Sequence, residues 1–406
     1  IPARQTPELL EDCVSAGVKV VQLYTAGFLE LGSGEGVELQ RRLLEIAGRG
    51  RMRLIGPNCM GVYCPRSGMS YSRDFPREPG NIGVLCQSGG NATYLVHSAA
   101  ARGLRFSKVL SYGNACDVNE GDILEYLARD PETAAIAAYL EGASDGRRLA
   151  DALARAVSSK PVVVYKGGAT QAGGRAAASH TGAMAGSRAA WDALLRQAGA
   201  MAADSVEEVT DALVGLLQVQ PRGLNACVVG VGGGASVLAT DELEREGVRL
   251  PPLPAALRER MERIIPPTGG MLGNPIDAFP LVGAILRRPA SGGAPVAAAC
   301  GDGAWGDLMG LVNEWPGIDL VVFQFAFDIP PIPVDDWVAA TMAPALDAIS
   351  LCRRPAAVVL HSVVTDASWR ASRRMQQKCL AQGTGFFLSP GAAARAVSRV
   401  VRAARR

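Results

Sequence analysis

The architecture follows from one segment, Ile82-Gly83-Val84-Leu85-Cys86-Gln87-Ser88-Gly89-Gly90, in which a short apolar run leads into two glycines. Such a run, bounded by glycine, predicts a buried strand, and the small residues after it predict a tight turn into a helix. Gly103 is placed to end that helix. The segment therefore predicts one strand-turn-helix unit of a parallel α/β sheet.

The same pattern recurs later in the chain, at Ala226-Cys227-Val228-Val229-Gly230-Val231-Gly232-Gly233-Gly234. Gly247 follows Gly234 by 13 residues, as Gly103 follows Gly90. Further segments correspond in order: Gly113–Asp117 with Gly273–Asp277, and the strand-like runs Ala135–Leu140 with Asp319–Phe325 and Pro161–Tyr165 with Pro355–Leu360. An internal repeat of this kind predicts two copies of one flavodoxin-like unit, over residues 79–220 and 221–406.

Residues 1–78 also alternate between helix and strand patterns. Helices are predicted over Pro7–Ala16 and Glu35–Arg49, and strands over Val18–Tyr24 and Met52–Ile55. The glycine-rich first turn of a Rossmann-like domain is not among these residues, so we expect residues 1–78 to be the C-terminal part of such a domain. Its ligands would bind beyond the carboxyl ends of the strands, where the loop Gly56–Gly61 begins.

Composition excludes several classes of function. The 41 basic and 39 acidic residues give a formal net charge of only +2, too small to attract nucleic acid or an anionic membrane surface, so neither is expected as a partner. No apolar run reaches the roughly 18 residues of a membrane helix. The 9 cysteines are scattered without CxxC spacing, which favours free thiols in a reducing cytoplasm. Only 3 histidines are present, and no metal site is predicted.

The candidate nucleophile is His180, in the glycine-rich segment after the predicted strand Pro161–Tyr165. Neutral imidazole can accept and pass on a phosphoryl group near neutral pH, although a lone loop histidine is more often structural. The two copies differ at the positions where catalytic residues would be needed. The first carries Glu141 at a strand end where the second has Ala326, and His180 has no counterpart. His361 is interpreted as a structural residue at a strand end.

Both copies place glycines at a helix start, where backbone N–H groups and the helix dipole stabilise an anion. We therefore predict that a phosphoryl group on His180 lies between the two helix starts. Glu141 would accept a hydrogen bond from the other imidazole nitrogen, as a carboxylate does in a catalytic triad. Besides His180 and Glu141, the predicted phosphate-binding residues are Ser88, Gly89, Gly90, Asn91, Thr181, Gly182, Gly233 and Gly234.

At these residues the chain resembles the nucleoside-diphosphate-forming acyl-CoA synthetases, relatives of succinyl-CoA synthetase. The resemblance covers nearly the whole chain and lies in motifs that follow the family's order: Ile55-Gly56-Pro57-Asn58, Gln87-Ser88-Gly89, Ser111-Tyr112-Gly113-Asn114 with Asp117, Asp130-Pro131-Glu132-Thr133, Tyr139-Leu140-Glu141-Gly142, Lys160-Pro161-Val162-Val163, Ser179-His180-Thr181-Gly182 and Asn274-Pro275-Ile276-Asp277.

The resemblance implies a reversible reaction in which acyl-CoA, phosphate and ADP or GDP give a carboxylic acid, CoA and ATP or GTP. It implies an acyl phosphate, a phosphohistidine at His180, and a CoA-binding role for Asn58. Nucleotide and Mg²⁺ would bind on an ATP-grasp β subunit or domain, with this chain as the α-type subunit of an oligomer. Two alternatives stay open: a CoA- or nucleotide-binding module without turnover, and a related enzyme with another acceptor, such as a carbamoyl group.

Overall fold

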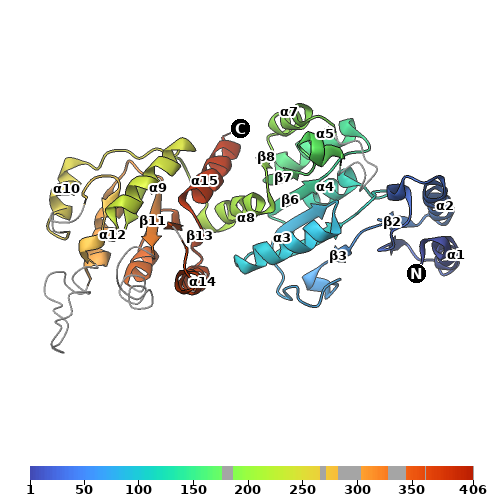
Figure 1. Cartoon of the computed structure of the whole chain (residues 1–406), viewed down its shortest axis with the longest axis horizontal. Coiled ribbons are helices and arrows are strands. Elements are labelled where there is room, and N and C mark those ends of the chain that lie inside the picture. The colour runs from blue at the N-terminus through green and yellow to red at the C-terminus, as the bar shows by residue number, and fades with distance from the viewer. Residues whose placement is uncertain (176–185, 266–270, 282–302, 328–343, 362, 406) are drawn as a thin grey trace. The chain divides into compact units, whose positions relative to one another are not determined.

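The computed structural model describes residues 1–175, 186–265, 271–281, 303–327, 344–361 and 363–405 (Figure 1). The chain divides into two compact units, Ile1–Thr210 and Asp211–Arg405. Both are built from helices and largely parallel sheets, which confirms the predicted α/β class. Among the described residues, no helix combines the length and apolar character needed to cross a membrane.

The first unit begins with two helices and a small parallel sheet. Helices α1 (Thr6–Ser15) and α2 (Gly34–Gly50) accompany β1 (Val20–Gln22) and β2 (Arg53–Ile55), which pair in parallel. Their apolar faces meet in a core that includes Leu10, Phe28, Leu43 and Leu54. The predicted helices and strands are all present, and only the first strand is clearly shorter than predicted.

A six-stranded sheet follows in the order β3-β5-β4-β6-β7-β8. Only β3 is antiparallel, and it pairs with β5. Leaving β3 aside, the order is that of a flavodoxin-like sheet, with the first strand flanked by the second and third. The strands are β3 (Gly61–Tyr63), β4 (Ile82–Cys86), β5 (Phe106–Ser111), β6 (Ala135–Leu140), β7 (Val162–Lys166) and β8 (Met201–Ala203).

Helices cover both faces of this sheet. One core cluster joins α4 (Glu120–Arg129), α5 (Gly146–Ser159) and α7 (Arg188–Ala198) to the sheet. Helix α3 (Gly89–Ala101) packs on β4 and β5 and contributes nothing to that cluster, because it covers the opposite face. Side-chain caps fix where these helices begin, for example Ser88 before α3 and Asn119 before α4.

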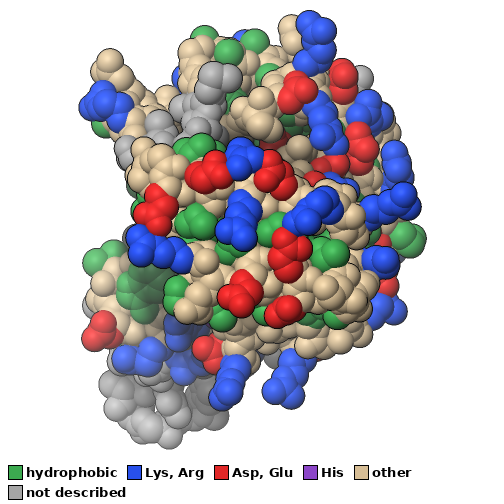
Figure 2. Space-filling model, turned by 90° about the vertical axis from the view of Figure 1, so that its right-hand side faces the viewer, with side chains coloured by type: hydrophobic (Ala, Val, Ile, Leu, Met, Phe, Trp, Pro, Cys, Tyr) green, Lys and Arg blue, Asp and Glu red, His purple; other side chains and the backbone are tan. Residues whose placement is uncertain are grey.

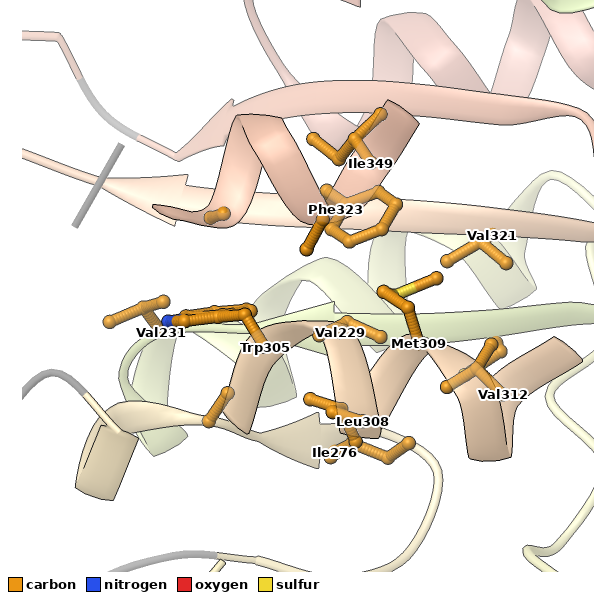
Figure 3. Packing of buried hydrophobic residues seen from close by; sticks show 14 of the residues in the cluster. Val229, Val231, Ile276, Trp305, Leu308, Met309, Val312, Val321, Phe323 and Ile349 are labelled. Carbon is orange, nitrogen blue, oxygen red and sulfur yellow. The ribbon is translucent and has the colours of Figure 1, made fainter. Parts of the chain in front are cut away.

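The second unit holds a five-stranded sheet in the order β10-β9-β11-β12-β13, all parallel. Among the described strands this order again places the first strand between the second and third. Buried side chains of α12 (Ala304–Glu314) pack on this sheet: Figure 3 shows Trp305 near Val231, Leu308 near Ile276 and Met309 toward Phe323. The strands are β9 (Ala226–Gly230), β10 (Ile276–Asp277), β11 (Leu320–Ala326), β12 (Ala356–His361) and β13 (Gly385–Phe387). The helices are α8 (Val206–Val214), which spans the unit boundary, α9 (Gly233–Arg245), α10 (Ala255–Met261), α12 (Ala304–Glu314), α14 (Asp366–Ala381) and α15 (Pro390–Ala404).

Backbone hydrogen bonds give the residue correspondence between the two sheets. The Gln87 N–H donates to the Tyr139 carbonyl at 3.0 Å, and the Val231 N–H donates to the Gln324 carbonyl at 3.2 Å. Ser88 therefore corresponds to Gly232, and Glu141 to Ala326. The predicted correspondence of Gly113–Asp117 with Gly273–Asp277 is looser, because the former follows β5 whereas the latter contains β10. The predicted domain boundaries at 78/79 and 220/221 stay predictions.

Candidate active site

The candidate site of the first unit lies where the chain leaves β4 and β6. These strands are neighbours, but the connection from β4 runs through α3 to β5 on one side, and that from β6 through α5 to β7 on the other. Such a topological switch point opens a crevice at the carboxyl ends of the strands, where α/β sheets bind ligands. Ser88 follows β4 and Glu141 follows β6, so the strand order brings two predicted site residues to this crevice.

Glu141 is held by residues at or directly after the ends of three strands, β4, β6 and β7. The Gln87 Oε1 atom accepts hydrogen bonds from the N–H groups of Glu141 at 2.7 Å and Gly142 at 3.1 Å. The Lys166 Nζ atom donates to the Glu141 carbonyl at 2.8 Å, and the Tyr139 hydroxyl donates to Glu141 Oε1 at 3.1 Å. Glu141 is only 6% exposed, so its carboxylate is held in place and protected from competing water.

Lys166 brings a buried positive charge to this site. It is the last residue of β7 and also donates to the Gly167 carbonyl, while its Nζ atom lies 5.2 Å from the centroid of the Trp191 ring. Burial lowers the pKa of Lys166, and the negative charge of Glu141 opposes that shift. Lys166 and Gln87 are not among the site residues predicted from the sequence. Their signal was a polar residue directly at the end of a buried strand.

The glycine turn before α3 has the geometry of an anion-binding helix start. Ser88 is the N-cap, and its Oγ atom accepts from the Asn91 N–H at 3.4 Å. Gly89 lies against Met60, with no room for a Cβ atom, whereas a Cβ atom on Gly90 would meet nothing within 4 Å. The start of α3 is therefore open at Gly90, and an anion there would be stabilised by the helix dipole.

The corresponding turn in the second unit differs in its charge. The Gly232 N–H donates to Asp277 Oδ1 at 3.0 Å, and Asp277 is only 3% exposed. A Cβ atom on Gly233 would lie 3.2 Å from Asp277 Oδ2, while Gly234 faces open space as Gly90 does. The second turn therefore already has a carboxylate of its own chain beside its amides, which makes it less favourable for a further anion than the first.

The three histidines fall in different places. His180 lies outside the described residues, together with Thr181 and Gly182. His97 is exposed on α3, with its ring centroid 5.3 Å from that of Phe75 in an edge-to-face contact. His361 is the last residue of β12, at a strand end as predicted.

Asn58 belongs to a polar network between the small sheet and the six-stranded sheet. It has a left-handed backbone, with φ at 57°, and its Nδ2 atom donates to Asn114 Oδ1 at 3.4 Å. Asn114 donates in turn to Glu30 at 2.5 Å and to Gln40 at 3.2 Å. Burial raises the pKa of Glu30, but hydrogen bonds from Gly27, Asn114 and Phe28 outweigh it and hold that pKa below its usual value. A structural role for Asn58 is thus apparent, and its CoA-binding role stays a prediction.

Charged side chains are spread over the described residues and do not gather into a metal site. Within these residues, no three His, Cys, Asp or Glu side chains are grouped so that they could hold a metal ion. Figure 2, which shows the side where α1 and α2 lie in Figure 1, has basic and acidic side chains interspersed over the surface. Several form surface ion pairs, such as Arg4 with Glu35 and Arg49 with Glu11.

Residues 79–216 match the family model of the succinyl-CoA ligase like flavodoxin domain. The chain is 35% identical over 277 residues to the α subunit of ADP-forming acetate–CoA ligase II from Pyrococcus furiosus, covering 68% of this chain and 60% of that protein. It is 34% identical over 275 residues to the ADP-forming 4-hydroxybutyrate–CoA ligase of Nitrosopumilus maritimus, covering 66% and 39%. The chain thus spans three fifths or less of the length of these relatives.

Solved structures show the same fold over the whole chain. The acetyl-coenzyme A synthetase 1 of Ca. Korarchaeum cryptofilum, solved in complex with phosphate and ADP, matches with a TM-score of 0.79 at 27% identity, covering 100% of this chain and 82% of that one. The protein PH0766 from Pyrococcus horikoshii matches with a TM-score of 0.75 at 25% identity, covering 100% and 83%.

Proposed function

We propose, because this chain belongs to the nucleoside-diphosphate-forming acyl-CoA synthetases of the succinyl-CoA synthetase superfamily, that it supplies the α-type part of an acid–thiol ligase. The reversible reaction would convert acyl-CoA, phosphate and ADP or GDP into a small carboxylic acid, CoA and ATP or GTP. The observation that carries the proposal is the switch point between β4 and β6, where an open helix start and a fixed carboxylate, Glu141, lie at the same crevice.

The proposed reaction has three transfers. First, a phosphate oxygen attacks the thioester carbonyl of acyl-CoA and the C–S bond breaks. CoA is the leaving group, and an acyl phosphate is formed. The imidazole of His180 then attacks phosphorus, the P–O bond to the acyl group breaks, and the carboxylic acid leaves. Finally a β-phosphate oxygen of ADP or GDP attacks phosphorus, the P–N bond breaks, and the nucleoside triphosphate leaves.

Residues of this chain would act in the middle step. The amides of Gly89 and Gly90 would stabilise the phosphoryl oxygens, because they lie at the open start of α3. Glu141 would orient the histidine ring and stabilise the positive charge that develops on it, as the carboxylate of a triad does. The Gln87 and Lys166 contacts keep the Glu141 backbone from moving during the transfer.

The experiment tests this middle step on the chain itself. The purified chain is incubated with ³²P-labelled acetyl phosphate, which stands for the proposed acyl phosphate, and the labelled peptide is mapped. We expect an acid-labile, base-stable label on His180 that the His180→Ala variant lacks. His97→Ala is the matched control, because it removes a histidine that is exposed on α3, and it should be labelled like the wild type. Label on His97, His361 or a serine would contradict the assignment.

A second assay separates the ligase from the alternatives of a binding module or another acceptor. With an ATP-grasp β subunit and Mg-ATP supplied, we expect acid- and CoA-dependent formation of ADP. The chain alone should form none, because net turnover needs the nucleotide site of the partner. Robust acid-dependent ADP formation by the chain without a partner would contradict the predicted need for a β subunit.

A further inference from the structure

The Tyr139 hydroxyl is held beside the Glu141 carboxylate by the strand geometry. The two residues are two positions apart, so their side chains leave the chain on the same face of the sheet. The hydroxyl donates to Glu141 Oε1 at 3.1 Å. Gly167, just after β7, makes this possible, because a Cβ atom there would collide with the Tyr139 hydroxyl. The contact therefore depends on the ends of two neighbouring strands.

The Tyr139 ring is fixed by a second tyrosine. Tyr165 lies directly opposite Tyr139 in the register of β6 and β7, and the ring centroids are 5.2 Å apart at an interplanar angle of 69°. This edge-to-face packing restricts the direction of the hydroxyl. Burial raises the pKa of Tyr139, and the negative charge of Glu141 raises it further. The phenol therefore keeps its proton and acts as a hydrogen-bond donor throughout the physiological range.

The second unit lacks both members of the pair. In the correspondence set by the backbone hydrogen bonds, Gln324 takes the place of Tyr139, and Ala326 takes the place of Glu141. The Gln324 side chain instead accepts a hydrogen bond from the Ser236 hydroxyl at 3.3 Å. The first unit thus has both the tyrosine and the carboxylate, and the second unit has neither at the corresponding positions. Because the sheet forms in both units, the tyrosine is not needed for the sheet itself.

We infer that Tyr139 is a positioning residue that fixes the carboxylate of Glu141 in the orientation in which it acts in phosphoryl transfer. The inference rests on the proposed function for the step that it serves. A tyrosine suits this role because it has only two side-chain torsions and a donor that cannot lose its proton near neutral pH. Without it, Glu141 would keep its charge and its backbone contacts, but Oε1 would lose the donor that sets its direction.

The test compares two single-atom deletions, Tyr139→Phe and Tyr165→Phe, in the labelling assay with acetyl phosphate. Removing a hydrogen bond to a charged group should slow the transfer in Tyr139→Phe by about 10-fold, with a less than about 2-fold change in the KM for acetyl phosphate. Tyr165→Phe keeps the ring packing and should stay within about 2-fold of the wild type.

Two further measurements make the inference decidable. If Tyr139 acts through Glu141, Tyr139→Phe should add little to the loss already caused by Glu141→Gln, whereas additive losses would overturn the inference. Equal losses in the two phenylalanine variants would overturn it as well. If the wild type takes up no label, the proposed function fails. The ¹³Cζ resonance of Tyr139 then still decides the contact: it should shift in Glu141→Gln more than that of Tyr165, and no shift would overturn the inference.

Discussion

The Lys166 ammonium group donates a hydrogen bond of 2.8 Å to the backbone carbonyl of Glu141 and lies over the Trp191 ring. The end of β7 is thereby tied both to the end of β6 and to the first turn of α7. A lysine at the end of a buried strand thus holds the backbone on which the candidate carboxylate stands.

Lys166→Met should impair phosphoryl transfer as well as stability. It removes the donor from two buried carbonyls, at a cost of about 1–3 kcal/mol in the free energy of unfolding. Lys160→Met is the matched control, because the Lys160 Nζ atom also donates to two carbonyls, those of Leu127 and Asp130. Urea unfolding should show similar losses in both variants, and the acetyl phosphate assay a loss only in Lys166→Met. Equal labelling of the two variants would mean that Lys166 is structural only.

Gly90→Leu should block the anion position while leaving the fold intact. Its side chain would enter the open space beside the first amides of α3. We expect labelling to fall by more than about 10-fold, since a helix start loses its anion when the approach to its amides is covered. Gly146→Leu is the control, because Gly146 begins α5 and also faces open space. A normal rate of labelling in Gly90→Leu would remove the start of α3 from the site.

The second glycine turn is tested at Gly234 rather than Gly233, because a side chain on Gly233 would press on Asp277. The prediction that both turns cradle one phosphate requires Gly234→Leu to reduce labelling as well. Asp277 already places a negative charge beside this turn, so we expect the loss to be smaller than in Gly90→Leu. Unchanged labelling in Gly234→Leu would leave the second copy as a structural partner.

Asn58→Gly should weaken CoA binding if Asn58 contacts CoA. Glycine keeps the left-handed backbone without strain, so only the side chain is lost. Asn114→Ala is the control, because it removes the partner of Asn58 in the polar network but not Asn58 itself. Calorimetric titration with CoA should show a loss of more than about 10-fold in Asn58→Gly and a smaller one in Asn114→Ala. Equal losses would show that Asn58 acts through the network.

Acid should remove the stability that Asp130 contributes. Burial raises the pKa of Asp130, but hydrogen bonds from Lys108 at 2.8 Å and Thr133 at 2.6 Å outweigh it, and the pKa lies below its usual value. A carboxyl group with a lowered folded-state pKa stabilises the protein fully above its unfolded pKa and ceases to do so as the pH falls through the folded pKa.

Urea unfolding of the wild type and Asp130→Asn should therefore differ most near pH 7, and the difference should shrink below about pH 4. Asp151→Asn, on the exposed side of α5, is the surface control and should change little at either pH. A difference that stays constant on acidification would contradict the ionic role of Asp130.

The sequence by itself determined the local elements and their repetition. Apolar runs of strand length and the glycines after them fixed β4 and β9, and β6 spans the predicted Ala135–Leu140. It also determined that Glu141 stands at a strand end while its counterpart is Ala326. These features could be predicted from the sequence because the length of a strand, the type of turn and the alternation of side chains depend on residues that are close in the chain.

Only the tertiary structure decided what surrounds Glu141. Gln87 is 54 positions away and Lys166 is 25 positions away, and both reach it because β4 and β7 are the two neighbours of β6. The similar motifs also did not show which backbone group each aspartate binds: Asp117 accepts from the Leu54 N–H, and Asp277 accepts from the Gly232 N–H of the glycine turn. The physical reason is that strand order and register are set by burial of the whole sheet, so contacts between strand ends are not encoded in the local sequence pattern.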